Sequence, residues 1–201
     1  METTITKLRR RILTVAFRDS MGHIPSALSI LEIIWTLYDK VMTPDDQFIL
    51  SKGHGVMALY AVLEEKGLLD WSTKLMGHPK RGGAILASTG SLGHGLPMAV
   101  GLALAKKIKG EAGTVYVLIG DGEMNEGTSW ESGLLIDKLN LNNISVGVDD
   151  NGTSEFKLPN PFGYKIIKTI KGDGVPHIQS REWHNKKLTK EDYEIAISQI
   201  S

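Results

Sequence analysis

Residues 114–153 read TVYVLIGDGEMNEGTSWESGLLIDKLNLNNISVGVDDNGT, and this stretch decides the fold that we expect. A β-rich apolar run, Val115 to Ile119, turns at Gly120-Asp121-Gly122, and a segment able to form a helix follows. A second β-rich run, Ile144 to Val148, ends in Asp149-Asp150-Asn151-Gly152. Strand, helix and strand in this order predict a βαβ unit. We therefore expect an α/β fold with an open, mainly parallel sheet and helices on both faces.

Asp121 and Asn151 are predicted to lie just beyond the carboxyl ends of the two strands. Right-handed crossover brings those ends to one edge of the sheet, where open α/β folds bind ligands. Converging oxygen side chains suit a hard cation such as Mg²⁺, and flanking glycines let a phosphate approach the backbone. From the residues alone an alternative stays open, because Gly-Asp-Gly is a common turn and Asp and Asn often end strands.

The motif residues together resemble a known family. Gly120-Asp121-Gly122, Glu126-Gly127 and Asn151 are similar to the thiamine-diphosphate motif of transketolases, especially of N-terminal halves encoded as separate polypeptides. The resemblance runs from near Met21 to Gly152 and returns at Trp183-His184. It implies the thiamine-diphosphate-binding fold, with thiamine diphosphate and Mg²⁺ (or Ca²⁺) as cofactors.

The resemblance also implies which residues hold the metal. In that family an aspartate, an asparagine and a backbone carbonyl two residues later are the metal ligands. The matching positions are Asp121, Asn151 and Thr153, and Gly122 is expected beside the cofactor together with Asn151 and Asp121.

Four histidines are candidates for the catalytic site. His23, His54 and His78 lie in loops rich in glycine and proline, and His184 follows Trp183 late in the chain. An isolated loop histidine is usually a polar surface residue. The resemblance overrides that reading and implies that all four surround the reacting carbons and phosphates, with His54 and His184 on the diphosphate side.

The loop from Ser88 to Pro97 is glycine-rich and precedes a predicted helix. Exposed N–H groups at a helix start favour an anion, although such a turn is more often purely structural. The resemblance implies that Gly90 and Leu92 line the cofactor. His94 stands where many relatives carry Gln, so it receives no role, and neither does His177.

Composition limits the classes of function. The chain has 201 residues, 23 Lys plus Arg, 23 Asp plus Glu and no cysteine. A neutral balance does not favour nucleic acid or an anionic membrane as partner, and thiolate metal sites and disulfides are excluded. No apolar run is long enough for a membrane span and no signal-peptide core begins the chain, so a cytoplasmic protein is the default expectation.

The remaining elements follow from periodicity. Ser26 is predicted to cap a helix that runs to about Tyr38. Arg9, Arg10 and Arg11 are assigned to the solvated face of a helix from Thr4 to Asp19. We expect one domain over residues 1–201, shortened after residue 153 by about one βα unit, so that 163–170 supplies the next strand directly. Further predicted elements are a strand at 47–50 and helices at 56–67, 97–107 and 190–200.

The resemblance implies a function for half of an enzyme. Transketolases transfer a two-carbon ketol unit between sugar phosphates, and the glutamate that they need over the pyrimidine ring belongs to a second domain. We therefore expect a heterotetramer with a separate C-terminal pyrimidine-domain subunit, in which Glu126 lies at the subunit interface rather than merely capping a helix. The alternatives are a 1-deoxyxylulose-phosphate-synthase-like or 2-oxo-acid dehydrogenase or decarboxylase subunit, and a non-catalytic scaffold.

Overall fold

The chain forms two compact units in the computed structural model, which describes residues 2–152, 154 and 159–200. The sheet unit comprises Val41–Gly53 and Pro79–Lys168, and the helical unit comprises Met1–Lys40, His54–His78 and Thr169–Ser201. The expectation of a single domain over the whole chain stays a prediction.

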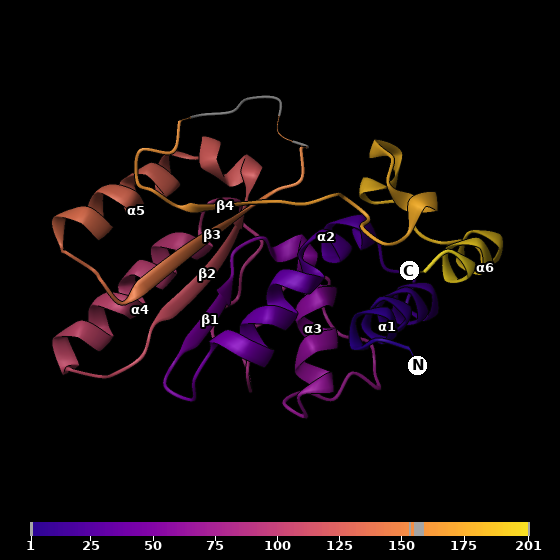
Figure 1. Cartoon of the computed structure of the whole chain (residues 1–201), viewed down its shortest axis with the longest axis horizontal. Coiled ribbons are helices and arrows are strands. Elements are labelled where there is room, and N and C mark those ends of the chain that lie inside the picture. The colour runs from indigo at the N-terminus through magenta and orange to yellow at the C-terminus, as the bar shows by residue number, and fades with distance from the viewer. Residues whose placement is uncertain (1, 153, 155–158, 201) are drawn as a thin grey trace. The chain divides into compact units, whose positions relative to one another are not determined.

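The sheet unit is built on four parallel strands in the order β1-β2-β3-β4 (Figure 1). The first two strands are apolar and largely buried, as is typical of parallel sheets, whereas the last strand has no buried residue. The pairing of β2 with β3 places Val115 opposite Ile144 and Gly120 opposite Asp149, so the predicted βαβ unit is confirmed. The strands are β1 (Gln47–Leu50), β2 (Val115–Gly120), β3 (Ile144–Asp150) and β4 (Lys165–Lys168).

Two helices complete the sheet unit. Helix α4 (Gly95–Lys109) packs against β1, β2 and β3, and α5 (Gly127–Lys138) packs against α4. A 3₁₀ turn (Asp121–Asn125) joins β2 to α5. Gly110, at φ 69°, ends α4 in the left-handed conformation that favours glycine. The core of this unit is Ile49, Leu96, Ala99, Val100, Ala103, Val115, Val117, Ile119, Met124, Leu141, Val146, Val148 and Tyr164.

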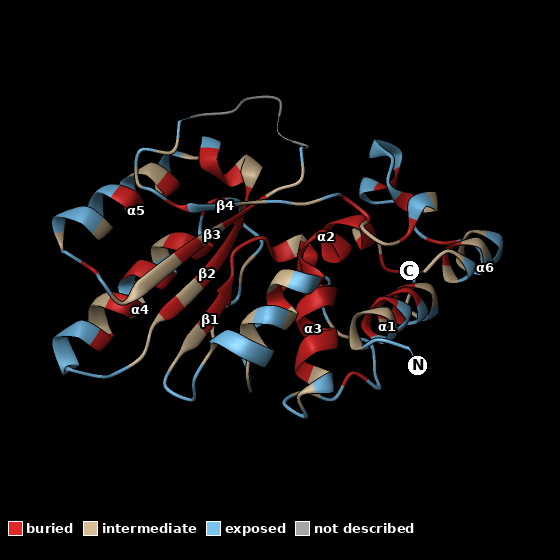
Figure 2. Ribbon diagram, viewed as in Figure 1, coloured by how far each residue is buried: buried red, intermediate tan, exposed pale blue. Residues whose placement is uncertain are grey.

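The helical unit packs α1 (Thr4–Arg18), α2 (Ile24–Thr36) and α3 (Val56–Glu65) against one another. Figure 2 shows α3 buried along most of its length, as its apolar sequence requires. Helix α6 (Lys190–Ser198) packs on α1, where the rings of Phe17 and Tyr193 stack with centroids 4.7 Å apart. The short helices are Leu37–Val41, Gly53–Gly55, Pro176–Ile178 and Arg181–His184.

Two local predictions were wrong. Helix α2 begins before Ser26, because His23 occupies the N-cap position and its carbonyl accepts the N–H of Ser26 at 3.1 Å. Arg9 is 7% exposed rather than solvated, because it forms ion pairs with Glu32 and Asp173 of the same unit. Buried arginine is retained where carboxylates compensate its charge.

The predicted strand at 163–170 is confirmed as β4, which pairs in parallel with β3. Two parallel neighbours need a crossover, usually through a helix. Here residues 151–164 make that connection, and the ring of Phe162 packs against α5 at Gly133. Among the helices described, none is long and apolar enough to cross a membrane.

Candidate active site

Four predicted histidines lie together in the helical unit. The ring centroid of His23 is 5.4 Å from that of His54, 5.1 Å from that of His184 and 6.4 Å from that of His78. The rings of His54 and His184 are 5.7 Å apart. Residues from distant stretches of sequence therefore form one imidazole cluster.

Backbone packing explains how the cluster forms. His23 adopts φ 61°, a left-handed conformation that turns the chain sharply into α2. A Cβ added at Gly22 would lie 2.2 Å from Oδ1 of Asn185, so only glycine lets the two loops approach this closely. The N–H of Gly172 donates to the carbonyl of Pro25 at 2.9 Å. These contacts hold the loop of His184 against the start of α2.

The cluster contains an unpartnered polar atom and a cation. Nδ1 of His23 is buried with no hydrogen-bond partner among the described residues, as expected of a group that meets a ligand. Burial, and then the charges of His184 and His78, lower the pKa of His23 and favour its neutral form. Lys171, 8% exposed, lies with Nζ 2.8 Å from Nδ1 of His184. Nothing in the local sequence had marked Lys171 as a site residue.

The predicted metal ligands lie at neighbouring strand ends of the sheet unit. Asp121 follows β2, where its Oδ1 accepts the N–H of Gly122 at 2.9 Å and its Oδ2 accepts the N–H of Ser154 at 3.1 Å. Asn151 follows β3, and its Nδ2 donates to Asp149 at 2.8 Å. This hydrogen bond directs the amide nitrogen inward to the sheet. The third predicted ligand, Thr153, lies outside the described residues.

These residues fit a divalent cation with a diphosphate. A Cβ added at Gly122 would meet nothing within 4 Å, so there is open space at the residue that directly follows Asp121. One carboxylate and one amide oxygen are hard donors that leave room in the shell for phosphate oxygens. In the part of the chain that is described, no group of three His, Cys, Asp or Glu side chains is placed to hold a metal. The metal site at the two strand ends therefore stays a prediction.

The glycine-rich loop is shaped by its glycines. Gly90 has φ 135° and Gly93 has φ 75°, conformations that other residues rarely adopt. The loop presents Leu92 with 48% of its surface exposed, an unusual position for a large apolar side chain that fits cofactor contact. His94, left without a role above, lies with its Nδ1 2.9 Å from the carbonyl of Leu92. This contact ties the His94 side chain to the backbone of the loop.

Glu126 occupies the N-cap position of α5 and is half-buried. Its stem packs on the glycine loop, since a Cβ added at Gly93 would lie 2.7 Å from Cβ of Glu126. Within the described residues of this chain, no hydrogen bond or ion pair of the Glu126 carboxylate is found, and it does not cap α5 by a side-chain bond.

Two buried acidic residues were missed from the sequence. Glu123 is 1% exposed and its carboxylate accepts hydrogen bonds from three different loops. Asp149 is completely buried and forms an ion pair with Lys52, which is 3% exposed. Glu123 lies two residues after Asp121, and Asp149 lies two residues before Asn151. Acidic residues are common in turns and at helix starts, so their sequence positions did not mark them as buried.

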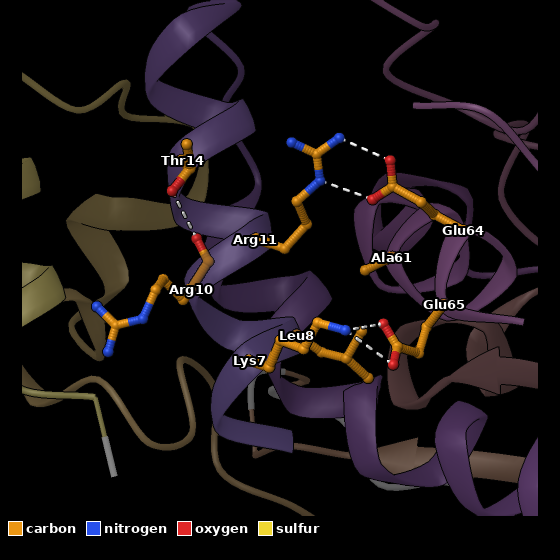
Figure 3. Close-up of a pocket in the computed structure, with 8 residues that line it drawn as sticks. All are labelled: Lys7, Leu8, Arg10, Arg11, Thr14, Ala61, Glu64 and Glu65. Carbon is orange, nitrogen blue, oxygen red and sulfur yellow. Dashed lines mark hydrogen bonds and ion pairs between the residues drawn. The ribbon is translucent and has the colours of Figure 1, made fainter. Parts of the chain in front are cut away.

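A pocket of about 480 Å³ lies between α1 and α3 in the helical unit (Figure 3). Its cations are paired: Lys7 with Glu65, Arg10 with Glu2, and Arg11 with Glu64. Because these charges compensate one another, the pocket has little attraction for an anion. No predicted site residue is among the described residues that line it.

Comparisons with known proteins identify the family of the chain. A sequence model of the family "Transketolase, thiamine diphosphate binding domain" matches residues 10–156. The chain is 32% identical to one subunit of the apulose-4-phosphate transketolase of Actinobacillus succinogenes, with 100% of this chain and 95% of that protein covered. It is 30% identical to 6-deoxy-6-sulfo-D-fructose transketolase subunit SqwG of a Clostridium species, with 96% and 93% covered.

A solved structure shares the fold of the chain. Transketolase from Campylobacter jejuni superposes with a TM-score of 0.78 at 22% identity, over 99% of this chain and 43% of that one. The chain thus spans less than half of that solved protein. The alignment with the A. succinogenes protein extends over 264 positions, whereas this chain has 201 residues. Part of the relative therefore has no counterpart here.

Proposed function

The chain belongs to the thiamine-diphosphate-binding part of the transketolase family, a family of transferases, and from this premise we propose that it is the N-terminal subunit of a two-chain transketolase. The observation that carries the proposal is the placement of Asp121 and Asn151 after the parallel strands β2 and β3, beside the open space at Gly122. We further propose that residues 1–201 act as one diphosphate-binding domain, shortened after residue 153. The longer alignment with its relative supports a shortening of the chain, and the position of that shortening after residue 153 is part of the proposal.

The metal would be Mg²⁺ or Ca²⁺, held by the side chains of Asp121 and Asn151 and by the backbone carbonyl of Thr153. When bound, thiamine diphosphate supplies a carbanion that can accept and release a two-carbon ketol unit. Gly122 and the loop of Gly90 and Leu92 would bring backbone and apolar surface to the cofactor. The chain's part is to bind, orient and shield that group.

The histidine cluster would serve proton transfer and sugar binding. His54 and His184 are assigned to the diphosphate side, and His23 and His78 to the substrate. A neutral imidazole can accept a proton or hydrogen-bond a hydroxyl, and the lowered pKa of His23 favours that neutral form at pH 7. Lys171, next to His184, would add positive charge for phosphate.

The partner would be a separate C-terminal subunit with the pyrimidine-binding domain, in a heterotetramer. Two relatives covered over more than nine-tenths of their length are named as subunits, and each is described as a transketolase. Glu126 supports the same arrangement, because its carboxylate is left without a hydrogen bond in the described part of this chain. The substrates would be ketoses and aldoses, usually phosphorylated.

Calorimetry and a ketol-transfer assay test the proposal. The full chain, alone or together with the partner subunit, should bind thiamine diphosphate only when Mg²⁺ or Ca²⁺ is present. Turnover of a panel of sugar phosphates should require both subunits. Turnover by this chain alone would exclude the two-chain arrangement, and failure to bind the cofactor in the assembled complex would favour a scaffold subunit.

A further inference from the structure

The carboxylate of Glu123 connects three segments of the sheet unit. Its Oε1 accepts hydrogen bonds from Oγ of Ser51 at 2.5 Å and from the N–H of Gly93 at 3.2 Å. Its Oε2 accepts the N–H of Gly120 at 2.8 Å. With 1% of its surface exposed, this side chain has its acceptors turned to the protein rather than to water.

Each of the three donors lies next to predicted site residues in the sequence. Ser51 follows β1 and directly precedes Lys52-Gly53-His54. Gly93 closes the glycine loop that presents Leu92, and Gly120 directly precedes Asp121. One carboxylate thus connects the ends of β1 and β2 with the glycine loop.

These connections leave little freedom of movement. A Cβ added at Gly95 would lie 2.3 Å from Oγ of Ser51, so the start of α4 is packed directly on that hydroxyl. The carbonyl of Gly93 accepts Oγ1 of Thr128 at 2.8 Å, which fixes the other side of the same residue. A loop held at both its N–H and its carbonyl cannot shift without breaking a buried hydrogen bond.

We propose that Glu123 is a positioning residue for cofactor binding, which sets the mutual spacing of the loops at Ser51, Gly93 and Gly120. The inference rests on the proposed function for the identity of the cofactor. Glu123 acts through the backbone of its neighbours and is not among the proposed metal ligands, because its side chain is buried and turned to the three segments that it connects.

The carboxyl group of Glu123 satisfies this arrangement. It offers acceptors on both oxygens, whereas a glutamine replaces one oxygen by an NH₂ group. In Glu123→Gln that NH₂ group would face an N–H, either of Gly120 or of Gly93. A buried donor without an acceptor is costly, so the affected loop should shift or open.

The test compares three variants of the full chain. Glu123→Gln removes the double acceptor, and Ser51→Ala removes a single donor while leaving Glu123 intact. The matched control is Asp46→Asn, because Asp46 also joins two loops of the sheet unit by accepting the N–H groups of Thr43 and Thr114. Those loops precede β1 and β2, at the opposite end of the strands from Glu123.

Two readouts separate the inference from the proposed function. Amide hydrogen exchange needs no cofactor, and it should show faster exchange at Gly93 and Gly120 in Glu123→Gln but not in Asp46→Asn. Calorimetry in the assembled enzyme, at fixed Mg²⁺, should show binding of thiamine diphosphate weakened by about tenfold or more for Glu123→Gln. Ser51→Ala should show a smaller loss, and Asp46→Asn should bind within about twofold of wild type.

The inference is overturned if Glu123→Gln binds the cofactor like wild type, or if all three variants lose affinity in proportion to their loss of thermal stability. If Glu123→Gln does not fold, the comparison of Ser51→Ala with Asp46→Asn decides in the same way. Absence of binding by the wild-type complex would instead refute the proposed function, and the exchange rates at Gly93 and Gly120 would still decide whether Glu123 ties the loops.

Discussion

Lys52 and Asp149 form an ion pair within the sheet unit, although only 3% and 0% of their side chains are exposed. Asp149 also accepts Nδ2 of Asn151 at 2.8 Å. The same carboxylate therefore neutralises a buried cation and orients the amide of a proposed metal ligand. Charges this deep are tolerated only where each has its partner.

Lys52→Met should be strongly destabilising, because it leaves the charge of Asp149 buried and uncompensated. We expect a loss of about 3–5 kcal/mol in the free energy of unfolding, measured by urea denaturation. Lys168→Met is the matched control. Lys168 pairs with the adjacent Asp150, but its side chain is 70% exposed, so its loss should cost less than about 1 kcal/mol. Equal losses in the two variants would contradict the role given to the buried pair.

Asp121→Ala should abolish binding of thiamine diphosphate that depends on magnesium, because it removes the only charged ligand proposed for the metal. The measurement is calorimetry in the assembled enzyme with and without Mg²⁺. Glu131→Ala, which removes an exposed carboxylate of α5, should leave the affinity unchanged. Undiminished affinity in a folded Asp121→Ala variant would remove the site assignment.

Much of the fold was predictable because local signals agree with the tertiary structure. The runs at 115–119 and 144–148 are β-rich and apolar, so they are stable only when buried in a parallel sheet. Gly120-Asp121-Gly122 then marks the turn at the strand end. The histidine cluster was predictable as a set only through the family resemblance, because nothing in the spacing of His23 and His184 indicates that the loops meet.

The residues that were missed depend on burial, which the local sequence does not reveal. Glu123 in the first turn of a helix-like segment is what a helix start ordinarily carries, yet its carboxylate turns inward to three loops. The burial of Arg9 was also hidden from the local sequence. Its position in a run of three arginines indicates a solvated face, but Glu32 and Asp173, far away in sequence, provide its counter-charges.

His23 should titrate below the usual range of histidine, about 6.5. Burial is the first cause of the lowered pKa and the charge of His184 the second, followed by His78 and Lys171. His184→Asn should therefore raise the pKa of His23, and Lys171→Met should raise it by less. NMR titration of labelled imidazoles measures both. No change in His184→Asn would show that the charge of His184 does not contribute to the lowered pKa.

The lowered pKa of His23 also predicts how stability depends on pH. Between the folded and the unfolded pKa, the unfolded chain binds more protons than the folded chain. The contribution of neutral His23 is thus fully present above the unfolded pKa and is lost as the pH falls through the folded pKa. His23→Gln should flatten the fall in stability below about pH 6.5, as measured by thermal unfolding at a series of pH values.

The connection from β3 to β4 contains Phe162, whose ring packs on α5. A Cβ added at Gly133 would lie 2.4 Å from Cδ2 of Phe162, so Gly133→Ala should destabilise the sheet unit although alanine favours a helix. Gly101 in α4 is the matched control, because a Cβ there would meet nothing within 4 Å. Gly101→Ala should stabilise by about 0.5–1 kcal/mol.

A double-mutant cycle shows whether the ring causes this effect. Phe162→Ala alone loses the contact of the ring with Trp130, whose ring centroid is 5.6 Å away, and should destabilise. Gly133→Ala should cost less in that background than in the wild type, because the atom that it would meet is gone. Additive losses in urea denaturation would show that Phe162 does not set the requirement for glycine at position 133, and that the short crossover is anchored in another way.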